Sequence, residues 1–204
     1  MAQNLKVTHY NNGDEIPFTN MFPQNSGAYT VYDDDADWSG NPNCPGPCAD
    51  VYGNLYNWFA VDDERGLCME GWHVPSDVEF MELEMFLGMS EEEANSYGHR
   101  GTDEGSKLAE NSDLWDGGQS IPPENADLVN NSEFGTSGFN ALPAGYRFWS
   151  NGTYGGMGAG VYFWSSSESD WIYAGYRQLY LLHSNVYRYE FFKTFGYSIR
   201  CLQD

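Results

Sequence analysis

The sequence has little positive charge. Its 204 residues include 9 lysines and arginines against 30 aspartates and glutamates, which gives a formal net charge of −21 at pH 7. Phosphate backbones are bound through Lys and Arg with release of counterions, so this balance argues against nucleic acid as a partner. It argues equally against anionic lipid. The acidity is typical either of solubility in a salty extracellular medium or of the binding of hard cations.

Long hydrophobic runs are also missing. No stretch approaches the roughly 18 apolar residues that a membrane span needs, so we predict no membrane insertion. Met1–Lys6 lacks the apolar centre of a signal peptide, and we expect the chain to be a mature segment of a longer protein. Aromatic residues, in contrast, make up 17% of the chain, which is too many for a disordered one.

Cysteine is scarce, with only Cys44, Cys48, Cys68 and Cys201. Four cysteines allow three pairings, and the sequence alone does not choose among them. The Pro-Gly-Pro between Cys44 and Cys48 favours a turn, which makes a local bridge plausible and leaves Cys68 to pair with Cys201. A zinc site would need two close Cys pairs or His at ligand spacing, and neither occurs. We therefore favour two disulfides and an oxidising location, secreted or on a surface.

The clearest helix begins after Ser76. Ser76 and Glu79 form a capping-box pattern, apolar residues then recur at helical spacing, and Gly88 ends the run. Ser90 and Glu93 repeat the pattern, which predicts a second short helix over residues 90–97.

Short strands are predicted on either side of this helical region. An alternating segment at 4–10 leads into a turn at 11–13, and 27–32 is a second extended run. The later strands are predicted at 139–142, 160–165, 174–182, 186–192 and 197–202, with turns at 184–185 and 194–196. Without a repeat or a linker, the pattern indicates one α+β unit over residues 1–204.

Six motifs in order carry a resemblance to a known family. They lie at Met1–Thr8, Tyr52–Val61, Cys68–Asp77, Ser137–Arg147, Phe163–Glu168 and Gly196–Cys201. With these motifs the chain resembles the Fibrobacter succinogenes major paralogous domain. In that family an additional strand precedes the segment that corresponds to Met1–Thr8, and the loop at Cys44–Cys48 has no counterpart.

The resemblance implies a C-type-lectin-like fold: a twisted antiparallel sheet, one main helix and long loops. Members resemble secreted or surface proteins of bacteria. Similar folds occur in carbohydrate-binding lectins, in bacterial and phage adhesins diversified by retroelements, and in formylglycine-generating enzymes. Because one fold hosts many functions, the function has to be argued from the site.

The C-terminal strands are unusually aromatic. If Leu179 and Leu181 point inward, alternation places Tyr176, Gln178, Tyr180 and Leu182 on the opposite face. Exposed aromatic side chains are rigid anchors of the kind enriched in binding surfaces. The candidate ligand-binding residues are Trp171, Tyr173, Tyr176, Gln178, Tyr180, Leu182, His183, Tyr187, Tyr189, Glu190 and Phe192. The alternative is that these rings belong to the core or to a subunit contact.

The same segment fits the pattern of a retroelement-diversified adhesin, in which fixed positions alternate with variable ones. The predicted scaffold positions are Ala174, Arg177, Leu179, Ser184, Val186, Arg188 and Lys193. Ordinary drift gives the same pattern, so both interpretations stay open.

An acidic run at Asp33, Asp34, Asp35 and Asp37 is the candidate calcium site, because Ca²⁺ prefers several hard oxygen ligands. It lacks the order of acids, the central Gly and the final Glu of an EF-hand. The Glu-Pro-Asn and Trp-Asn-Asp runs of lectin calcium sites are absent too. A solvated acidic loop is the alternative.

Catalytic motifs are missing, and His73 is interpreted as a hydrogen-bonded residue before the helix. An oxidase-like activity would need a reactive thiol, which two disulfides would not leave. We expect no enzyme but an extracellular recognition or adhesion module that binds a glycan or protein. The alternative is a structural subunit of a surface layer, filament or virion that self-associates through the same aromatic face.

Overall fold

Helices and strands both contribute to the structure, a computed structural model that describes residues 3–19, 21–32, 44, 47–115 and 122–204. The α-helices are α1 Cys48–Tyr52, α2 Trp58–Val61, α3 Asp77–Phe86, α4 Glu91–Ala94, α5 Glu104–Leu108 and α6 Asp127–Asn130. The strands are β1 Tyr29–Thr30, β2 Leu55–Tyr56, β3 Trp72–His73, β4 Gly98–Arg100, β5 Ala144–Arg147, β6 Tyr154–Met157, β7 Gly160–Glu168, β8 Tyr173–Tyr180, β9 His183–Phe192 and β10 Leu202–Gln203. The predicted α+β class is confirmed.

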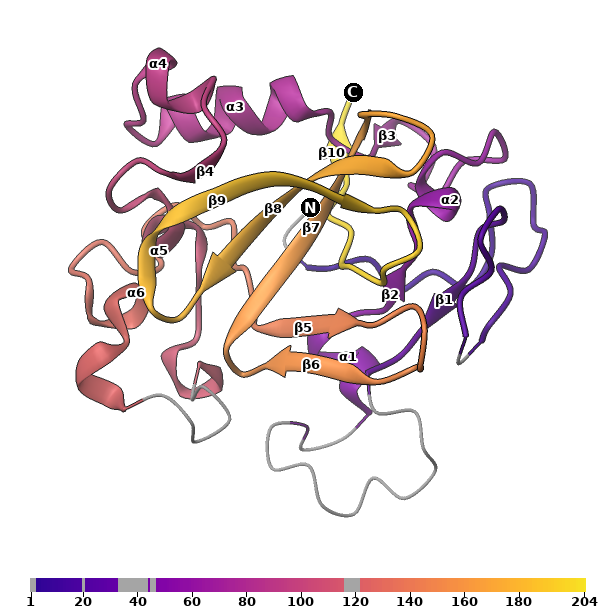
Figure 1. Cartoon of the computed structure of the whole chain (residues 1–204), viewed down its shortest axis with the longest axis horizontal. Coiled ribbons are helices and arrows are strands. Elements are labelled where there is room, and N and C mark those ends of the chain that lie inside the picture. The colour runs from indigo at the N-terminus through magenta and orange to yellow at the C-terminus, as the bar shows by residue number, and fades with distance from the viewer. Residues whose placement is uncertain (1–2, 20, 33–43, 45–46, 116–121) are drawn as a thin grey trace.

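The main sheet has six strands in the order β4-β9-β8-β7-β5-β6 (Figure 1). All its neighbours are antiparallel except β5 and β7, which pair in parallel at Gly145 and Val161. Residues 196–198 lie between β7 and β2. Ser198 forms an isolated bridge with Phe163 of β7, and Tyr197 forms one with Tyr56 of β2. Two small sheets, β1-β2 and β10-β3, complete the pairing.

Helix α3 forms as the sequence predicts. The Ser76 hydroxyl accepts a hydrogen bond from the Glu79 backbone N–H, and the Glu79 carboxylate accepts one from the Ser76 N–H (2.8 Å). Each bond satisfies a donor that the first turn of a helix leaves open. Gly88 follows the last turn with a φ of 122°, where a side chain would be strained. The second box, at Ser90 and Glu93, starts α4.

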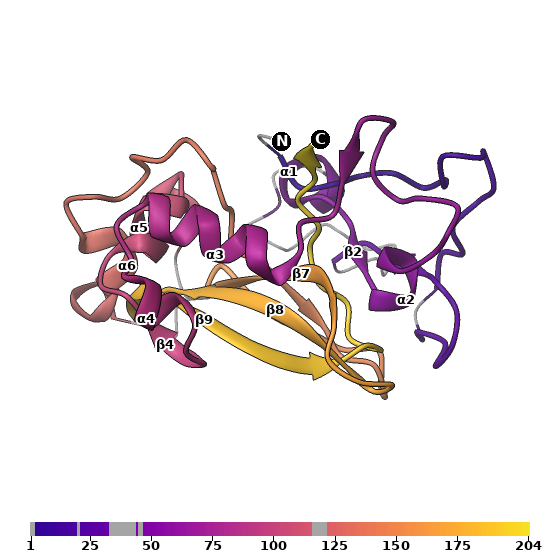
Figure 2. The ribbon, with the colours of Figure 1, turned by 90° about the horizontal axis from the view of Figure 1, so that it is seen from above.

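Helix α3 lies across one side of the main sheet, as the view from above shows (Figure 2). A buried ion network holds it there. Arg100 of β4 donates two hydrogen bonds of 2.8 Å to the Glu84 carboxylate, which also accepts Nε–H of Arg177 from β8 (2.7 Å). Asp77 accepts from Arg177 (2.6 Å) and from two nitrogens of Arg188 in β9 (2.6 and 3.0 Å).

Three guanidinium groups thus share two carboxylates, and backbone carbonyls accept further hydrogen bonds from them. Arg188 donates to the carbonyls of Asn95 (3.0 Å) and Ser96 (3.1 Å), and Arg100 donates to that of Ala94 (3.0 Å). Burial by itself raises the pKa of Asp77, but Arg188 and Arg177 outweigh it, so the net pKa lies below its usual value. The network joins α3, the end of α4 and three strands.

The predicted scaffold positions are buried. Ala174, Arg177, Leu179, Val186, Arg188 and Lys193 are all less than 9% exposed, whereas Ser184 is half-buried. The predicted turn at 184–185 is wrong by a few residues, because β9 already begins at His183. The chain turns at Leu181 and Leu182 instead, where the Leu181 side chain is buried and its N–H donates to Ala159 O (2.8 Å).

Three other predicted strands are not regular strands. Residues 4–10 and 139–142 pair through single bridges and isolated hydrogen bonds, and so does the segment predicted at 197–202, of which only Leu202 belongs to a strand, β10. Leu5, for example, donates to Ile199 O (2.9 Å) and accepts from Asn54 N–H (2.9 Å), so its two backbone groups serve different segments. Alternation along the sequence does not reveal whether a continuous partner strand exists.

The structure confirms both disulfides, Cys44–Cys48 and Cys68–Cys201. The first bridge joins cysteines that are 4 positions apart in the sequence, and the second joins cysteines that are 133 positions apart. The second bridge fixes the segment before β3 to the segment before β10. His73 of β3 lies between two carboxylates, with Asp204 at 2.6 Å from Nδ1 and Glu79 at 2.8 Å from Nε2.

We expect Glu84→Gln to destabilise the fold by about 3–5 kcal/mol, because two buried arginines lose their shared countercharge. Urea unfolding at pH 7 measures the effect. The matched control is Glu82→Gln in the same helix, where the side chain is exposed and the change should stay within about 0.5 kcal/mol. Equal stability of the two variants would contradict a structural role for the network.

Acid should weaken the fold through Asp77. Its folded pKa is depressed, so its stabilising contribution is present above the unfolded pKa near 3.9 and is lost as the pH falls through the folded pKa. In Asp77→Asn this part of the pH dependence of unfolding should disappear. The variant should also lose the stability that the Asp77 carboxylate contributes at neutral pH. An unchanged slope between pH 5 and pH 2 in this variant would be the contrary result.

The two disulfides should differ in their contribution to stability. In the chain-entropy model the long Cys68–Cys201 loop is worth about 5 kcal/mol and the short Cys44–Cys48 loop about 2 kcal/mol. Double Cys→Ser variants of each bridge, unfolded in urea, test the ranking. A larger loss for the Cys44–Cys48 pair would show that the long loop is already restricted in the unfolded chain.

Candidate functional site

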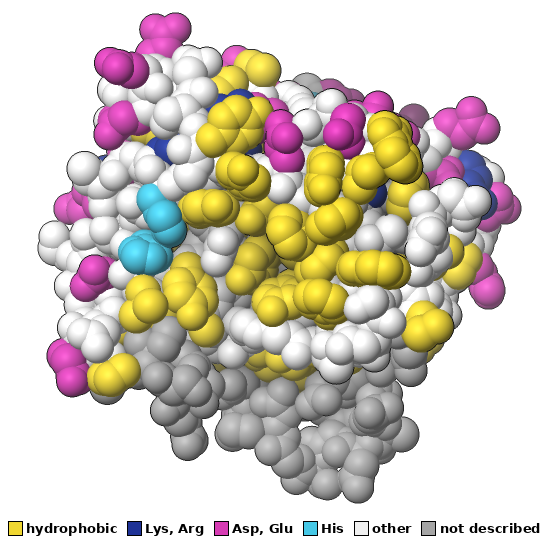
Figure 3. Space-filling model, viewed as in Figure 1, with side chains coloured by type: hydrophobic (Ala, Val, Ile, Leu, Met, Phe, Trp, Pro, Cys, Tyr) yellow, Lys and Arg dark blue, Asp and Glu magenta, His cyan; other side chains and the backbone are white. Residues whose placement is uncertain are grey.

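The side of the main sheet opposite α3 carries a continuous group of aromatic side chains. We call it the aromatic face and define it by Tyr146, Tyr162, Tyr180, Tyr187, Tyr189 and Phe191, none of which is fully buried. No helix in the described ranges covers it (Figure 2). In Figure 3 hydrophobic side chains gather over the middle of this side, and acidic side chains lie along its left, upper and right edges.

Strand pairing puts these rings next to one another. Tyr187 is opposite Gln178, and Tyr162 of β7 is opposite the same glutamine on its other side. The Tyr187 and Tyr189 rings are stacked with centroids 6.0 Å apart, and the Tyr162 ring meets Tyr146 edge to face at 5.1 Å. Gln178 donates to the Tyr162 hydroxyl (3.2 Å).

Tyr176 is the exception among the predicted contact residues on this face. It is only 6% exposed, because the rings of Tyr162, Tyr187, Phe191 and Tyr197 surround it at 5.3–6.3 Å. Burial strongly raises the pKa of its hydroxyl above the usual value. Tyr176 therefore supports the outer rings from below, and its prediction as an exposed contact is wrong.

The other predicted residues separate into two groups. Gln178, Tyr180, His183, Tyr187 and Tyr189 lie on or beside the aromatic face, with Leu182 half-buried in the turn. Between β8 and β9, Tyr173 lies opposite Phe192 and Gly175 lies opposite Glu190. Alternation along the strands therefore puts Tyr173, Glu190 and Phe192 on the α3 side of the sheet. There the Glu190 carboxylate accepts a hydrogen bond from the Tyr97 hydroxyl (2.9 Å).

Two histidines mark one end of the face. The rings of His99 from β4 and His183 from β9 have centroids 4.2 Å apart, and His99 also contacts Tyr187 at 4.8 Å. His99 Nδ1 lies 3.1 Å from Asn185 Oδ1. Burial and then the neighbouring His99 lower the pKa of His183, whereas Asp127 acts in the opposite direction. In Figure 3 histidine side chains lie at the surface on this side, beside the hydrophobic side chains.

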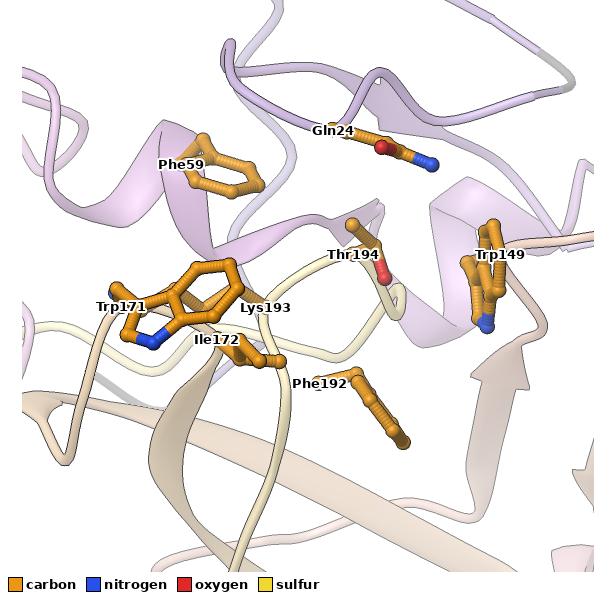
Figure 4. A pocket seen from close by; sticks show the side chains of 8 residues that line it. All are labelled: Gln24, Phe59, Trp149, Trp171, Ile172, Phe192, Lys193 and Thr194. Carbon is orange, nitrogen blue, oxygen red and sulfur yellow. The ribbon is translucent and has the colours of Figure 1, made fainter.

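A pocket of about 260 Å³ lies at the opposite end of β9 (Figure 4). Phe59 of α2, Trp149 of the β5–β6 loop and Trp171 of the β7–β8 loop contribute aromatic walls, together with Phe192. Trp171 is 82% exposed, the highest value for any aromatic side chain on the sheet and its loops. Gln24, Ile172, Lys193 and Thr194 complete the lining.

Sequence reasoning found Trp171 and Phe192 but missed the rest of this pocket. Gln24, Phe59 and Trp149 are distant in the sequence, and only the fold brings them to Trp171. On the aromatic face it likewise missed Tyr146, Tyr162 and His99, which come from other strands. For Tyr146 and Tyr162 a signal exists, since both lie in aromatic strand segments that alternate with buried residues.

Metal binding has no support within the part of the chain that the structure describes. That part contains no group of three or more His, Cys, Asp or Glu side chains arranged to hold an ion. The acidic run at Asp33, Asp34, Asp35 and Asp37 lies outside the described residues. None of the described helices has the length and apolar character of a membrane span.

The comparison with family models gives one result. The model of the Fibrobacter succinogenes major domain matches residues 1–203. The chain belongs to this family. The match covers the whole main sheet, the aromatic face and the pocket, so both candidate surfaces are parts of the family domain in this chain. No curated protein and no solved structure matches the chain significantly.

Two histidines should titrate on opposite sides of the usual value near 6.5. Hydrogen bonds that the His73 ring donates to Asp204 and then to Glu79 raise the pKa of His73, and burial lowers that of His183. The favourable contribution of His73 is thus lost as the pH rises through its folded pKa, and that of His183 as the pH falls through its own. Imidazole NMR titration measures both, and a His183 pKa above 6.5 would contradict the observed burial.

Proposed function

We propose that this chain is a secreted or surface-displayed recognition module with a C-type-lectin-like arrangement, which binds a glycan or protein through the aromatic face. The observation that carries the proposal is the open side of the main sheet. A surface that is rich in half-exposed tyrosines and bordered on several sides by acidic side chains is typical of binding sites, because tyrosine offers large contact area at low entropic cost.

The architecture favours binding over catalysis. All four cysteines form disulfides, so no thiol is left for the redox chemistry of an oxidase-like enzyme. Both ring nitrogens of His73 are engaged by carboxylates next to the capping box. The two bridges also suit an oxidising, extracellular location, where disulfides persist.

The supporting layer makes the surface rigid. Tyr176, Tyr197 and Trp164 are buried beneath the outer rings, and the Trp164 indole donates to Tyr56 O (3.0 Å). Outer rings that rest on packed aromatics lose little further freedom when a ligand binds, which reduces the entropic cost of recognition. The same argument applies to a permanent contact with a second copy of the chain.

We expect Tyr189→Ala to weaken binding of the oxidised protein to its ligand on a glycan and cell-envelope array by at least about tenfold, which corresponds to about 1.4 kcal/mol. Tyr189 is 49% exposed, so its truncation leaves the core intact. The matched control is Phe86→Ala, an 87% exposed aromatic on α3 at the other side of the sheet. Unchanged binding by Tyr189→Ala would refute the proposed surface.

Calcium and assembly are tested with the same protein. Loss of array binding in chelator would assign a role to the acidic run at 33–37, and binding that is indifferent to chelator would leave recognition to the aromatic face alone. If the face is instead a subunit contact, sedimentation will show association that rises with protein concentration. That association would then be lost in Tyr189→Ala but kept in Phe86→Ala.

A further inference from the structure

The pocket at the end of β9 has a chemical character different from that of the aromatic face. In Figure 4 Trp171 and Phe59 lie on one side of it and Trp149 on the other, with Phe192 at its base. The opening between them is hydrophobic on both sides. Its volume of about 260 Å³ is just below the range of roughly 300–1,000 Å³ that holds drug-sized ligands.

Polar groups lie at the edges of these walls. The Thr194 hydroxyl points into the space between the aromatic side chains, and the Gln24 amide lies at the rim (Figure 4). Within the described residues neither side chain has a hydrogen-bond partner in the protein. The hydroxyl and the amide can each donate and accept a hydrogen bond at the mouth of the pocket.

The lining carries no charge that a ligand would have to match. Lys193 is the one cationic side chain among its residues, and it is 3% exposed. Its ammonium group pairs with the Glu168 carboxylate and lies 4.4 Å from the centre of the Trp58 ring. With a net charge of −21 on the whole chain, an anionic ligand would be repelled.

We propose that this pocket binds a single pyranose ring of a neutral glycan. A pyranose presents C–H groups on its faces and hydroxyls around its edge, which matches aromatic walls with a hydroxyl and an amide at the rim. Trp171 and Trp149 hold the faces of the sugar, and Thr194 and Gln24 hydrogen-bond to its edge. The proposal rests on the proposed function, and it names the ligand class for one part of the recognition surface.

The tryptophan indole N–H signals in a ¹H–¹⁵N NMR spectrum of the oxidised full chain test the proposal. The probes are methyl β-D-glucopyranoside, methyl β-D-xylopyranoside and methyl α-D-mannopyranoside at tens of millimolar. At least one should shift Trp171 and Trp149 with a dissociation constant in the millimolar range. Trp58 and Trp164 serve as internal references, because their buried indoles donate to Ser165 O (2.8 Å) and Tyr56 O (3.0 Å).

Two further compounds and three variants define the ligand class. Acyclic sorbitol has the hydroxyls without the ring and should cause no shift, and the anionic glucuronide should bind less tightly than the glucoside. Trp171→Ala should weaken binding about tenfold, and Thr194→Val, which keeps the shape without the hydroxyl, several-fold. Phe86→Ala should change nothing.

The outcomes separate this proposal from the proposed function. If none of the three pyranosides shifts Trp171, or if sorbitol shifts it equally, the sugar pocket is refuted even when Tyr189→Ala still abolishes array binding. If the pyranosides bind at Trp171 while Tyr189→Ala leaves array binding intact, the pocket stands and the aromatic face fails. Preferential binding of the glucuronide would overturn the neutral ligand class.

Discussion

The buried pairing of three arginines with two carboxylates is the interaction on which the rest of the structure depends. Arg100, Arg177 and Arg188 come from three adjacent strands, and both acids come from α3. Burying these charges is tolerable only because every one of them has a partner, so the helix has one position in which the network closes. The network therefore fixes the register of α3 against β4, β8 and β9, and with it which side of the sheet remains open.

Features that depend on neighbouring residues could be predicted from the sequence. The capping boxes at Ser76 and Ser90 need only residues three positions apart, and the Pro-Gly-Pro loop brings Cys44 to Cys48. The pairing of Cys68 with Cys201 followed once that loop was assigned. The resemblance to diversified adhesins also placed Arg177 and Arg188 among the fixed scaffold positions, although it did not reveal their partners.

Features that depend on distant segments could not be predicted. Tyr176 alternates correctly but is buried, because Tyr197 and Phe191 arrive over it from other parts of the chain. Glu190 and Phe192 are adjacent to the aromatic face in sequence and lie on the other side of the sheet in register. The pocket combines an N-terminal residue, Gln24, with three loops that meet only after folding. Aromatic composition predicts where such a region lies in the sequence, but it does not predict which of the rings are buried and which are exposed.

Successive residues of β8 and β9 face opposite sides of the sheet, and the two sides restrict the choice of side chain differently. Residues that point toward α3, such as Arg177 and Arg188, cannot change without leaving a buried charge unpaired. Residues one position away lie on the opposite side of the sheet: Gln178 is half-buried and donates to the Tyr162 hydroxyl, and Tyr189 is exposed. The same two strands therefore meet two different demands: one set of side chains holds α3 in place through buried charges, and the alternate set forms the open side of the sheet without pairing those charges.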